Sequence, residues 1–364
     1  MSCTEVFLNI RDFGARGDGK SDDTQALLAA MDAATRDKGT VYFPSGTYCI
    51  HPVKVPSHIT LMGNSSWGYS GRLEENGQPA DPGYMGNTVL AALSGDARAL
   101  LDLDSCCGTR IVGLTLDGRH LGAQMHGVYS RHGGVEQNNC YEDCRITRFT
   151  GCGLKLDWVW VFAVRRCIII DNAQHGIDVD RGYDGWVIDN QISANGLMGI
   201  NAGPGMVCYT GNRIEWNKEG GMFCNDTQNI NVTGNSFDHN FGPAIWFQNS
   251  RANAVSGNMS RNDGSGRTDD RSCAFLLEDS QGISLTGNTV WCWPHRELSE
   301  AGHTADGTPY YGIVVKNLTD SVVSSNAMHR CASREVIRDL GGHSRTLIEG
   351  NVGSTFEESA PCAD

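Results

Sequence analysis

The sequence predicts an all-β fold, a right-handed parallel β-helix with about 22–23 residues in each coil. Three observations lead to this prediction. A glycine-led apolar motif returns at a nearly constant step, two columns of asparagines return at the same step, and one helical segment precedes the repeats. Repeats of this length are typical of solenoids, in which each unit buries its inner face only against its neighbours.

The repeated motif is a Gly-apolar-x-apolar strand start that is followed by a polar turn and a second apolar strand. The first three steps between starts are 23, 23 and 22 residues. The starts are Gly153-Leu154-Lys155-Leu156, Gly176-Ile177-Asp178-Val179, Gly199-Ile200-Asn201-Ala202, Gly221-Met222-Phe223-Cys224, Ala244-Ile245-Trp246-Phe247, Ala274-Phe275-Leu276-Leu277 and Gly312-Ile313-Val314-Val315. Stacking such strands about 4.8 Å apart pairs their backbones in parallel sheets.

Asparagines follow the same step in two columns, which indicates stacked corners. One column holds Asn190, Asn212, Asn235, Asn258, Asn288, Asn326 and Asn351, and the other holds Asn172, Asn195, Asn217 and Asn240. Asparagine tolerates a left-handed backbone, so we expect these residues to form the sharp corners themselves. Their side chains are then expected to hydrogen-bond from coil to coil.

Alternate strand residues point inward in a β-strand, which predicts the core. The inward set is Ile177, Val179, Ile200, Ala202, Met222, Cys224, Ile245 and Phe247. Cys144, Cys167, Cys208 and Cys224 fall at apolar strand positions and are also expected in the core. The 14 cysteines show no zinc-like CxxC spacing, so we interpret them as buried free thiols, which favours a reducing, cytoplasmic compartment. No signal peptide is visible, although a processed secreted chain would look the same.

The whole chain, 1–364, is expected to form one domain, with an N-terminal cap and first strands in 1–50 and clear coils in 126–354. Residues Gln25 to Thr35 have helical apolar spacing after an acidic start, as expected of a helix that covers the open end of the first coil. Strands are expected at 40–44 and 59–62. Longer coils place loops at 261–272 and 293–311, and an early excursion spans 64–86. Long loops beside a rigid scaffold are typical of a binding cleft.

Two segments carry a resemblance to a known group. They are Asp12-Phe13-Gly14-Ala15-Arg16-Gly17-Asp18-Gly19-Lys20-Ser21-Asp22-Asp23-Thr24 and Gly39-Thr40-Val41-Tyr42-Phe43-Pro44-Ser45-Gly46-Thr47-Tyr48. They resemble the opening of the pectate-lyase-like β-helix superfamily, which includes polysaccharide lyases, glycoside hydrolases, alginate epimerases and phage tailspikes. The resemblance implies the fold and a carbohydrate substrate, and it leaves the reaction open.

The formal net charge of −13 argues against a nucleic-acid partner, which needs clustered basic residues, and slightly favours a neutral glycan. No stretch reaches the roughly 20 apolar residues of a membrane span.

Outward strand positions form columns of candidate site residues. Asp178 and Asp180 lie two apart on one strand, and Asp157 is expected one coil below Asp180. Carboxylates this close cannot all ionise normally, and glycoside hydrolysis uses one protonated and one ionised carboxyl group. The predicted catalytic residues are Asp178, Asp180, Asp157 and Lys155. The predicted substrate-binding residues are His175, Arg181, Asn201, Trp246, Gln248 and Glu278, with Trp246 as a platform for a sugar ring.

Comparison with families of this superfamily leaves alternatives open. The acid set of polygalacturonase-type hydrolases appears only in part and in the wrong order. Alginate epimerases carry an aromatic-Gly-Phe-Asp-Pro-His strand, in which Asp178 matches the aspartate while Asp180 stands in place of the histidine. Calcium-dependent pectate lyases use a basic residue beside aspartates, as Lys155 would be beside Asp157, Asp178 and Asp180. The acid pair of β-helical inulin fructotransferases has no confident match.

The sequence therefore favours a glycoside hydrolase or transglycosylase that acts on a poly- or oligosaccharide through paired aspartates. The alternatives are a polyuronate lyase or epimerase with Lys155 as base, a fructotransferase, and a non-catalytic tailspike-like module. No cofactor is expected except calcium for the lyase alternative, and a homotrimer is possible.

Overall fold

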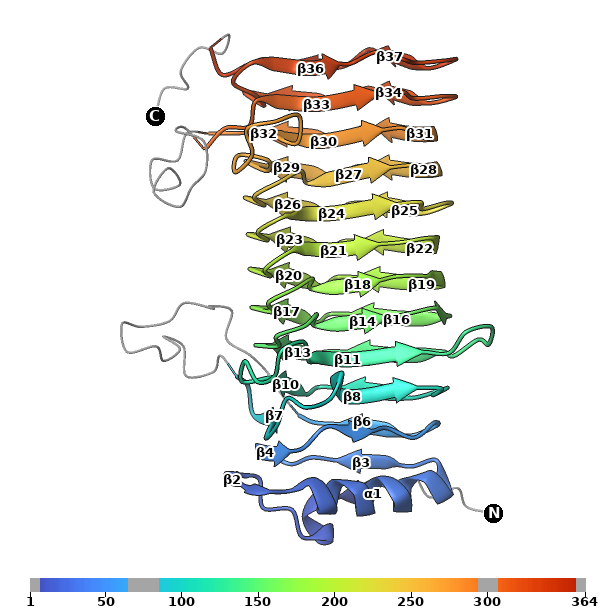
Figure 1. Cartoon of the computed structure of the whole chain (residues 1–364), viewed down its shortest axis with the longest axis vertical. Helices are drawn as coiled ribbons and strands as arrows, with labels where there is room; N and C mark the ends of the chain where they lie inside the picture. Colours follow the sequence, from blue (N-terminus) through green and yellow to red (C-terminus); the bar gives the residue numbers. More distant parts are fainter. Residues whose placement is uncertain (1–6, 65–84, 294–306, 358–364) are drawn as a thin grey trace. The chain divides into compact units, whose positions relative to one another are not determined.

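The computed structural model describes residues 7–64, 85–293 and 307–357, and it divides into two compact units, Met1–Asp178 and Val179–Asp364. Each unit is a stack of parallel β-helix coils with three sheets, here called A, B and C (Figure 1). The units adjoin in sequence within β18 (Ile177–Val179). The expectation of one domain stays a prediction.

In the first unit, strands of successive coils pair in parallel and in register. Sheet A contains β1 (Phe7–Asn9), β3 (Thr40–Tyr42), β6 (Thr60–Met62), β9 (Arg110–Val112), β12 (Asn139–Glu142) and β16 (Phe162–Arg165). Sheet B contains β2 (Asp18–Asp22), β4 (Gly46–Ile50), β7 (Thr88–Ala92), β10 (Thr115–Asp117), β13 (Arg145–Thr147) and β17 (Ile168–Ile170). Sheet C contains β5 (Val53–Lys54), β8 (Ala99–Asp104), β11 (His126–Arg131) and β14 (Leu154–Leu156), and β15 (Val159–Trp160) is a short extra strand.

The second unit repeats this arrangement. Its sheet A contains β19 (Gly182–Ile188), β22 (Gly205–Thr210), β25 (Asn231–Thr233), β28 (Arg251–Ser256), β31 (Gln281–Thr286), β34 (Val322–Ser324) and β37 (Leu347–Glu349). Sheet B contains β20 (Gln191–Ser193), β23 (Arg213–Glu215), β26 (Ser236–Asp238), β29 (Met259–Arg261), β32 (Thr289–Trp291), β35 (Ala327–His329) and β38 (Val352–Gly353). Sheet C contains β21 (Met198–Ala202), β24 (Gly220–Asn225), β27 (Ile245–Gln248), β30 (Cys273–Glu278), β33 (Tyr311–Lys316) and β36 (Glu335–Asp339).

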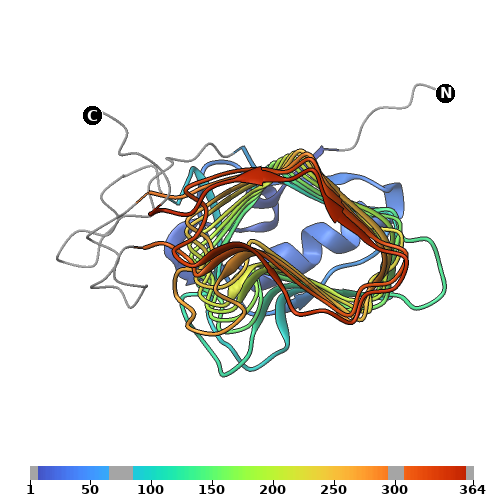
Figure 2. The same ribbon diagram turned by 90° about the horizontal axis from the view of Figure 1, so that it is seen from above.

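The predicted cap helix is α1 (Thr24–Asp37), which lies across the end of the first coils of its unit, after the short 3-10 helix η1 (Ile10–Phe13) (Figure 2). Its buried face holds Leu27, Ala30 and Met31. The Asp22 carboxylate accepts the N–H of Thr24 at 2.9 Å, so the acidic start satisfies one of the free amide groups of the first turn. The apolar face of α1 thus covers coil edges that would otherwise be open to water.

The predicted core is confirmed with one exception. All eight inward residues of the repeat are at most 1% exposed, as are Cys144 and Cys167. Cys208 is only half-buried, because it lies between the inward Val207 and Tyr209 on β22 and therefore points outward. Its assignment to the core was wrong by one residue of strand register.

The asparagine ladders exist in the second unit, but the reason given for them needs correction. Asn212 Oδ1 accepts from both the backbone N–H (3.1 Å) and Nδ2 (2.9 Å) of Asn190, and this contact recurs up to Asn351. The ladder asparagines are not left-handed. The residue before each one is, as at Gly211 (φ 67°) and Gly234 (φ 66°). The position before the asparagine therefore needs glycine or another residue that tolerates a left-handed backbone, and the asparagine itself hydrogen-bonds to the neighbouring coil.

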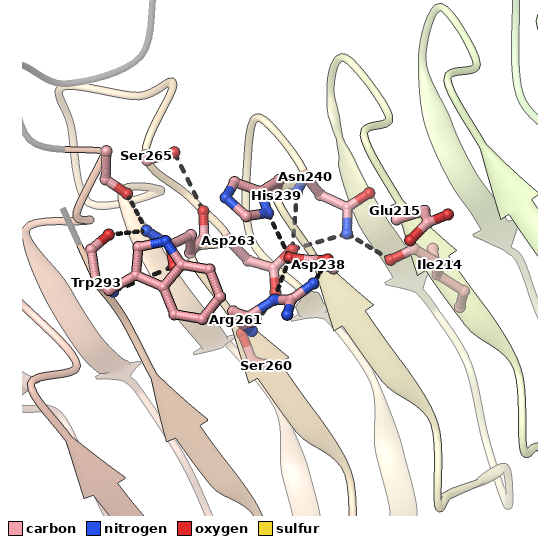
Figure 3. A network of polar contacts seen from close by, with 12 residues as sticks. Ile214, Glu215, Asp238, His239, Asn240, Ser260, Arg261, Asp263, Ser265 and Trp293 are labelled. Atoms are coloured by element: carbon pink, nitrogen blue, oxygen red, sulfur yellow. Dashed lines mark hydrogen bonds and ion pairs between the residues drawn. The ribbon is translucent and has the colours of Figure 1, made fainter. Parts of the chain in front are cut away.

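The second ladder ends in a buried aspartate. Asn195, Asn217 and Asn240 bond in sequence, and Asn240 donates from its N–H (2.9 Å) and Nδ2 (2.7 Å) to Asp263 Oδ1. The other oxygen of Asp263 accepts from Ser260 Oγ at 2.6 Å, beside the contact of Arg261 with Asp238 (Figure 3). The last residue of a ladder only has to accept hydrogen bonds from the residue before it, so a carboxylate can stand there in place of an amide. Burial raises the pKa of Asp263 to about 6.

Replacing Asn235 by alanine is expected to lower the free energy of unfolding by at least about 2 kcal/mol, because buried donors on Asn212 lose their acceptor. Chemical denaturation measures the loss. The matched control is Asn231→Ala, at an exposed position of the same coil. Equal losses in the two variants would contradict the structural role of the ladder.

Asp263 makes stability depend on pH. Its pKa is higher in the folded chain, about 6, than the ordinary 3.8, so its favourable contribution is complete below about pH 4 and is lost as the pH rises through 6. This difference in pKa corresponds to a change in the free energy of unfolding on the order of 3 kcal/mol. The melting temperature of the native chain should therefore fall relative to that of Asp263→Asn as the pH rises from 4 to 8. A constant difference between the two curves would refute the assignment.

Candidate functional site

The outward face of sheet C in the first unit carries a column of polar side chains, one from each coil. Tyr129 on β11 pairs in register with Asp102 on β8 and with Lys155 on β14. Because outward residues of stacked coils stand about 4.8 Å apart, neighbours in this column are within contact distance. The β-helix thus brings together residues that are 23 to 27 positions apart in sequence.

Lys155 and Asp178 form the most sheltered ion pair of this column. Lys155 Nζ lies 2.9 Å from Asp178 Oδ2, and the side chains are 24% and 11% exposed. Cys152 Sγ lies 3.8 Å from the same oxygen. A charge pair with this little water around it interacts more strongly than a surface pair, and loss of one partner leaves a poorly hydrated charge.

Tyr129 connects the column to a second carboxylate. Its hydroxyl donates to Asp157 Oδ2 at 2.9 Å, and Arg131 Nε lies 3.5 Å from the same oxygen. The Arg98 guanidinium lies 4.0 Å from the centre of the Tyr129 ring and binds Asp102 and Asp104. Burial, and then the bond to Asp157, raise the pKa of Tyr129 to about 12, so the phenol keeps its proton at neutral pH.

His126 lies at the start of β11 beside this group. Its Nδ1 accepts the backbone N–H of Cys152 at 2.8 Å, so a neutral ring carries its proton on Nε2. Burial, followed by the positive charge of Lys155, lowers the pKa of His126 to about 4. The ring is therefore neutral at pH 7 and adds no charge to the site.

The predicted residues of the second unit fall in three places. Arg181 Nε lies 3.8 Å from Asp180 Oδ2, and both side chains are about half exposed. Trp246 Nε1 and Gln248 Nε2 both donate to Glu278 Oε1, at 2.8 and 3.0 Å. Asn201 is half-buried and pairs in register with Phe223.

Comparisons with known proteins agree with this architecture. Residues 7–78 match the family model described as rhamnogalacturonase A/epimerase, pectate lyase-like, and residues 162–293 match the right handed beta helix region. Together the two matches support the pectate-lyase-like superfamily of right-handed parallel β-helices. Each family model covers less than half of the chain, and no narrower family follows from them.

The proteins that this chain resembles are named for different reactions on carbohydrates. Alginate lyase 7 of Azotobacter vinelandii is 30% identical over 215 residues, which are 53% of this chain and 23% of the relative. The mannuronan C-5 epimerase AlgE4 A-module of the same organism superposes with a TM-score of 0.63 and 18% identity, covering 96% of this chain and 100% of the module. DFA-IIIase from Arthrobacter chlorophenolicus A6 without its lid superposes with a TM-score of 0.68 and 15% identity, covering 97% of this chain and 99% of that chain.

The chain spans less than a quarter of the length of the first curated relatives. The structural likenesses, all at low identity, support the shared fold alone.

The residues of the first-unit site do not suit a calcium ion, which some pectate lyases of the superfamily use. Calcium takes six to eight oxygen ligands. Here Asp178 is bound by Lys155, and Asp157 is bound by Tyr129 and lies beside Arg131. Within residues 7–64, 85–293 and 307–357, no cluster of three or more His, Cys, Asp or Glu side chains is arranged to hold a metal ion.

Sequence reasoning missed Tyr129 and His126. The strand start His126-Gly127-Val128 has the same pattern as His175-Gly176-Ile177, and that signal was available. The orientation of Tyr129 toward Asp157 depends on side-chain contacts that spacing does not reveal. His175 is half-buried, and its carbonyl accepts the N–H of Gly153 at 3.1 Å.

The predicted cleft loops are described only in part. Loop 261–272 overhangs the outward face of sheet C in the second unit and lines a pocket with Asp269, Asp270 and Arg271. Most of 64–86 and of 293–311 lies outside the described residues. No helix in the described part of the chain is long and apolar enough to cross a membrane.

Lys155→Met is expected to lower the free energy of unfolding by about 3 kcal/mol, because it leaves the Asp178 carboxylate without its cation. The double variant Lys155→Met with Asp178→Asn should recover part of that loss, since no charge then remains without a partner. Chemical denaturation of the native chain, the two single variants and the double variant gives the coupling free energy between Lys155 and Asp178. Additive effects would show that the two side chains do not interact.

Proposed function

We propose that the protein is a carbohydrate-active enzyme that removes the proton next to the carboxylate of a uronate unit in an acidic polysaccharide, as a lyase or an epimerase does. The ion pair of Lys155 with Asp178 on the outward face of sheet C supports this proposal most directly. The likeness to an alginate lyase over 53% of the chain gives further support.

The chemistry requires stabilisation of negative charge. Loss of the C5 proton places charge on the neighbouring carboxylate, and a fixed cation in a sheltered site stabilises that charge strongly. Lys155 is assigned this contact, and Asp178 is a positioning residue that fixes the ammonium group 2.9 Å away. Lys155 accepts the C5 proton in its unprotonated form and then, as an ammonium group, lies beside the charge that has formed, while Arg131 holds the carboxylate.

Tyr129 is the candidate proton donor. Its hydroxyl donates to Asp157 until a substrate oxygen replaces that acceptor. Delivery of the proton to the departing glycosidic oxygen gives an unsaturated product. Delivery to C5 from the opposite face gives the epimer, and both routes conserve atoms and charge.

The local charge suits an anionic sugar better than the whole chain does. This face carries four basic side chains, Lys54, Arg98, Arg131 and Lys155, and four carboxylates, Asp102, Asp104, Asp157 and Asp178. The two sets balance, whereas the net charge of the chain is −13. Long-range repulsion of a polyuronate is thus reduced where it would bind.

Hydrolysis or transglycosylation through paired aspartates has less support. It requires a protonated carboxylic acid beside an ionised carboxylate. The ammonium group of Lys155 favours the ionised form of Asp178, so Asp178 is a poor acid. Hydrolysis, fructosyl transfer and non-catalytic binding are distinguished from the proposal by one experiment.

Incubation with oligouronates and neutral oligosaccharides in D₂O, and separately in H₂¹⁸O, is read out by mass spectrometry. An epimerase should give a uronate with deuterium at C5, a lyase should give an unsaturated uronate that has no hydrogen at C5, and neither should incorporate ¹⁸O. Lys155→Met and Asp178→Asn should lower the rate of either reaction by about 100-fold or more, since acid–base groups typically contribute that much. Lys218→Met, at an exposed turn, is the matched control.

Incorporation of ¹⁸O with cleavage would establish hydrolysis instead, and cyclic sugars would establish intramolecular transfer. Absence of any product, with binding retained, would leave a non-catalytic glycan-binding module.

A further inference from the structure

A second pocket lies over the outward face of sheet C in the second unit. Strands β27, β30 and β33 form its floor, and the loop before β30 forms its wall with Asp269, Asp270 and Arg271. Its volume is about 450 Å³. That volume is within the range of about 300–1,000 Å³ that small-molecule sites occupy.

Leu276 in the floor of this pocket belongs to an apolar cluster that lies outside the coil. Cys273, Leu276, Tyr311 and Val314 are buried in a cluster against which Trp246 packs. Leu276 and Val314 belong to an outward column, where a β-helix open to water would carry polar residues. Their burial shows that the chain has built a covered, partly apolar recess on this face.

Trp246 is held in one orientation at the edge of the recess. Its N–H donates to Glu278 at 2.8 Å, and its ring lies 4.4 Å from that of Phe223 at an angle of 43°. An indole fixed by its polar end offers an apolar face at little conformational cost. The C–H face of a pyranose or furanose ring is a matching surface.

The polar groups around Trp246 are mainly acceptors. Trp246 and Gln248 both bond to Oε1 of Glu278, so among the described residues Oε2 takes no recorded hydrogen bond. Arg271 is already bound to Asp269, with Nη2 2.7 Å from Oδ2. Acceptors of this kind match the hydroxyl donors of a sugar.

The lining of the pocket carries more carboxylates than cations, which disfavours a uronate. Asp269, Asp270 and Glu278 face Arg271 and Lys316, and Arg338 outside the lining is shared between Asp270, at 3.8 Å, and Glu335, at 2.9 Å. One of the cations is engaged by Asp269. A second carboxylate brought next to Glu278 would be repelled and would lose its hydration.

We propose that this pocket binds one neutral sugar unit, stacked on Trp246 and hydrogen-bonded through vicinal hydroxyls to Glu278. The site is separate from the reaction assigned to Lys155 and needs no turnover to be tested. It adds a preference for glycans that carry an uncharged residue, as a branch or within the chain.

Isothermal titration calorimetry with neutral gluco-, manno-, galacto- and fructo-oligosaccharides, and with oligouronates, tests the proposal on the full chain. At least one neutral series should bind saturably and more tightly than every oligouronate. Trp246→Ala should weaken that binding about tenfold, a loss of roughly 1.4 kcal/mol. Trp186→Ala, which removes an indole that is 45% exposed, is the control and should bind as the native chain does.

Glu278→Gln keeps an acceptor for Trp246 and Gln248 but removes the negative charge. It should therefore narrow the difference in affinity between neutral and acidic sugars. Lack of saturable binding to every neutral series, or equal affinity in Trp246→Ala with the fold intact by circular dichroism, would overturn the proposal. Lys155→Met should not change this affinity. Loss of binding in that variant would place the sugar at the reaction site instead.

Discussion

The structure depends on hydrogen bonding between successive coils. A coil has three short strands and no hydrogen-bond partners of its own for their backbone groups, so each coil must lie directly on the next. The asparagine ladders fix this register at the corners, where strands end. Each side chain accepts twice from the coil before it and donates to the backbone, as Asn235 does with Asn212 and Tyr209. A corner displaced by one residue would break all of these bonds.

Function follows from that constraint because a fixed coil step makes fixed outward columns. In the first unit the column brings Tyr129, Lys155 and Asp178 together although they lie on different coils. In the second unit the equivalent face carries Trp246 and Glu278, and a longer coil supplies a wall. Neither group needs a flexible loop to form its described contacts. Chemistry on this fold is therefore altered by exchanging outward residues, while the inward ones remain apolar.

The period, the core and the cap were predictable because each depends on spacing alone. Inward positions such as Ile200 and Met222 follow from alternation, and α1 follows from helical apolar spacing with an acidic start. The corner was misread by one position, since asparagine is a common left-handed residue and the glycine before it was not weighed. Cys208 failed for a related reason: a small apolar residue fits either face of a strand. The role of Asp263 as the last member of a ladder depends on where the chain leaves the coil, which spacing does not show.

The candidate site was only partly predictable. Lys155, Asp157 and Asp178 were identified as one outward group, but their partners set their chemistry. A lysine against Asp178 and a tyrosine on Asp157 turn an apparent pair of acids into two separately bound carboxylates.

The central claim is that a uronate carboxylate binds beside Lys155. A crystal structure of the Asp178→Asn variant with a bound oligouronate that keeps its carboxylates measures this directly. The account predicts the sugar carboxylate within hydrogen-bond distance of Lys155 Nζ, with C5 facing that nitrogen and the Tyr129 hydroxyl near the ring. An oligouronate bound elsewhere on the chain, with Lys155 still in contact only with residue 178, would contradict it.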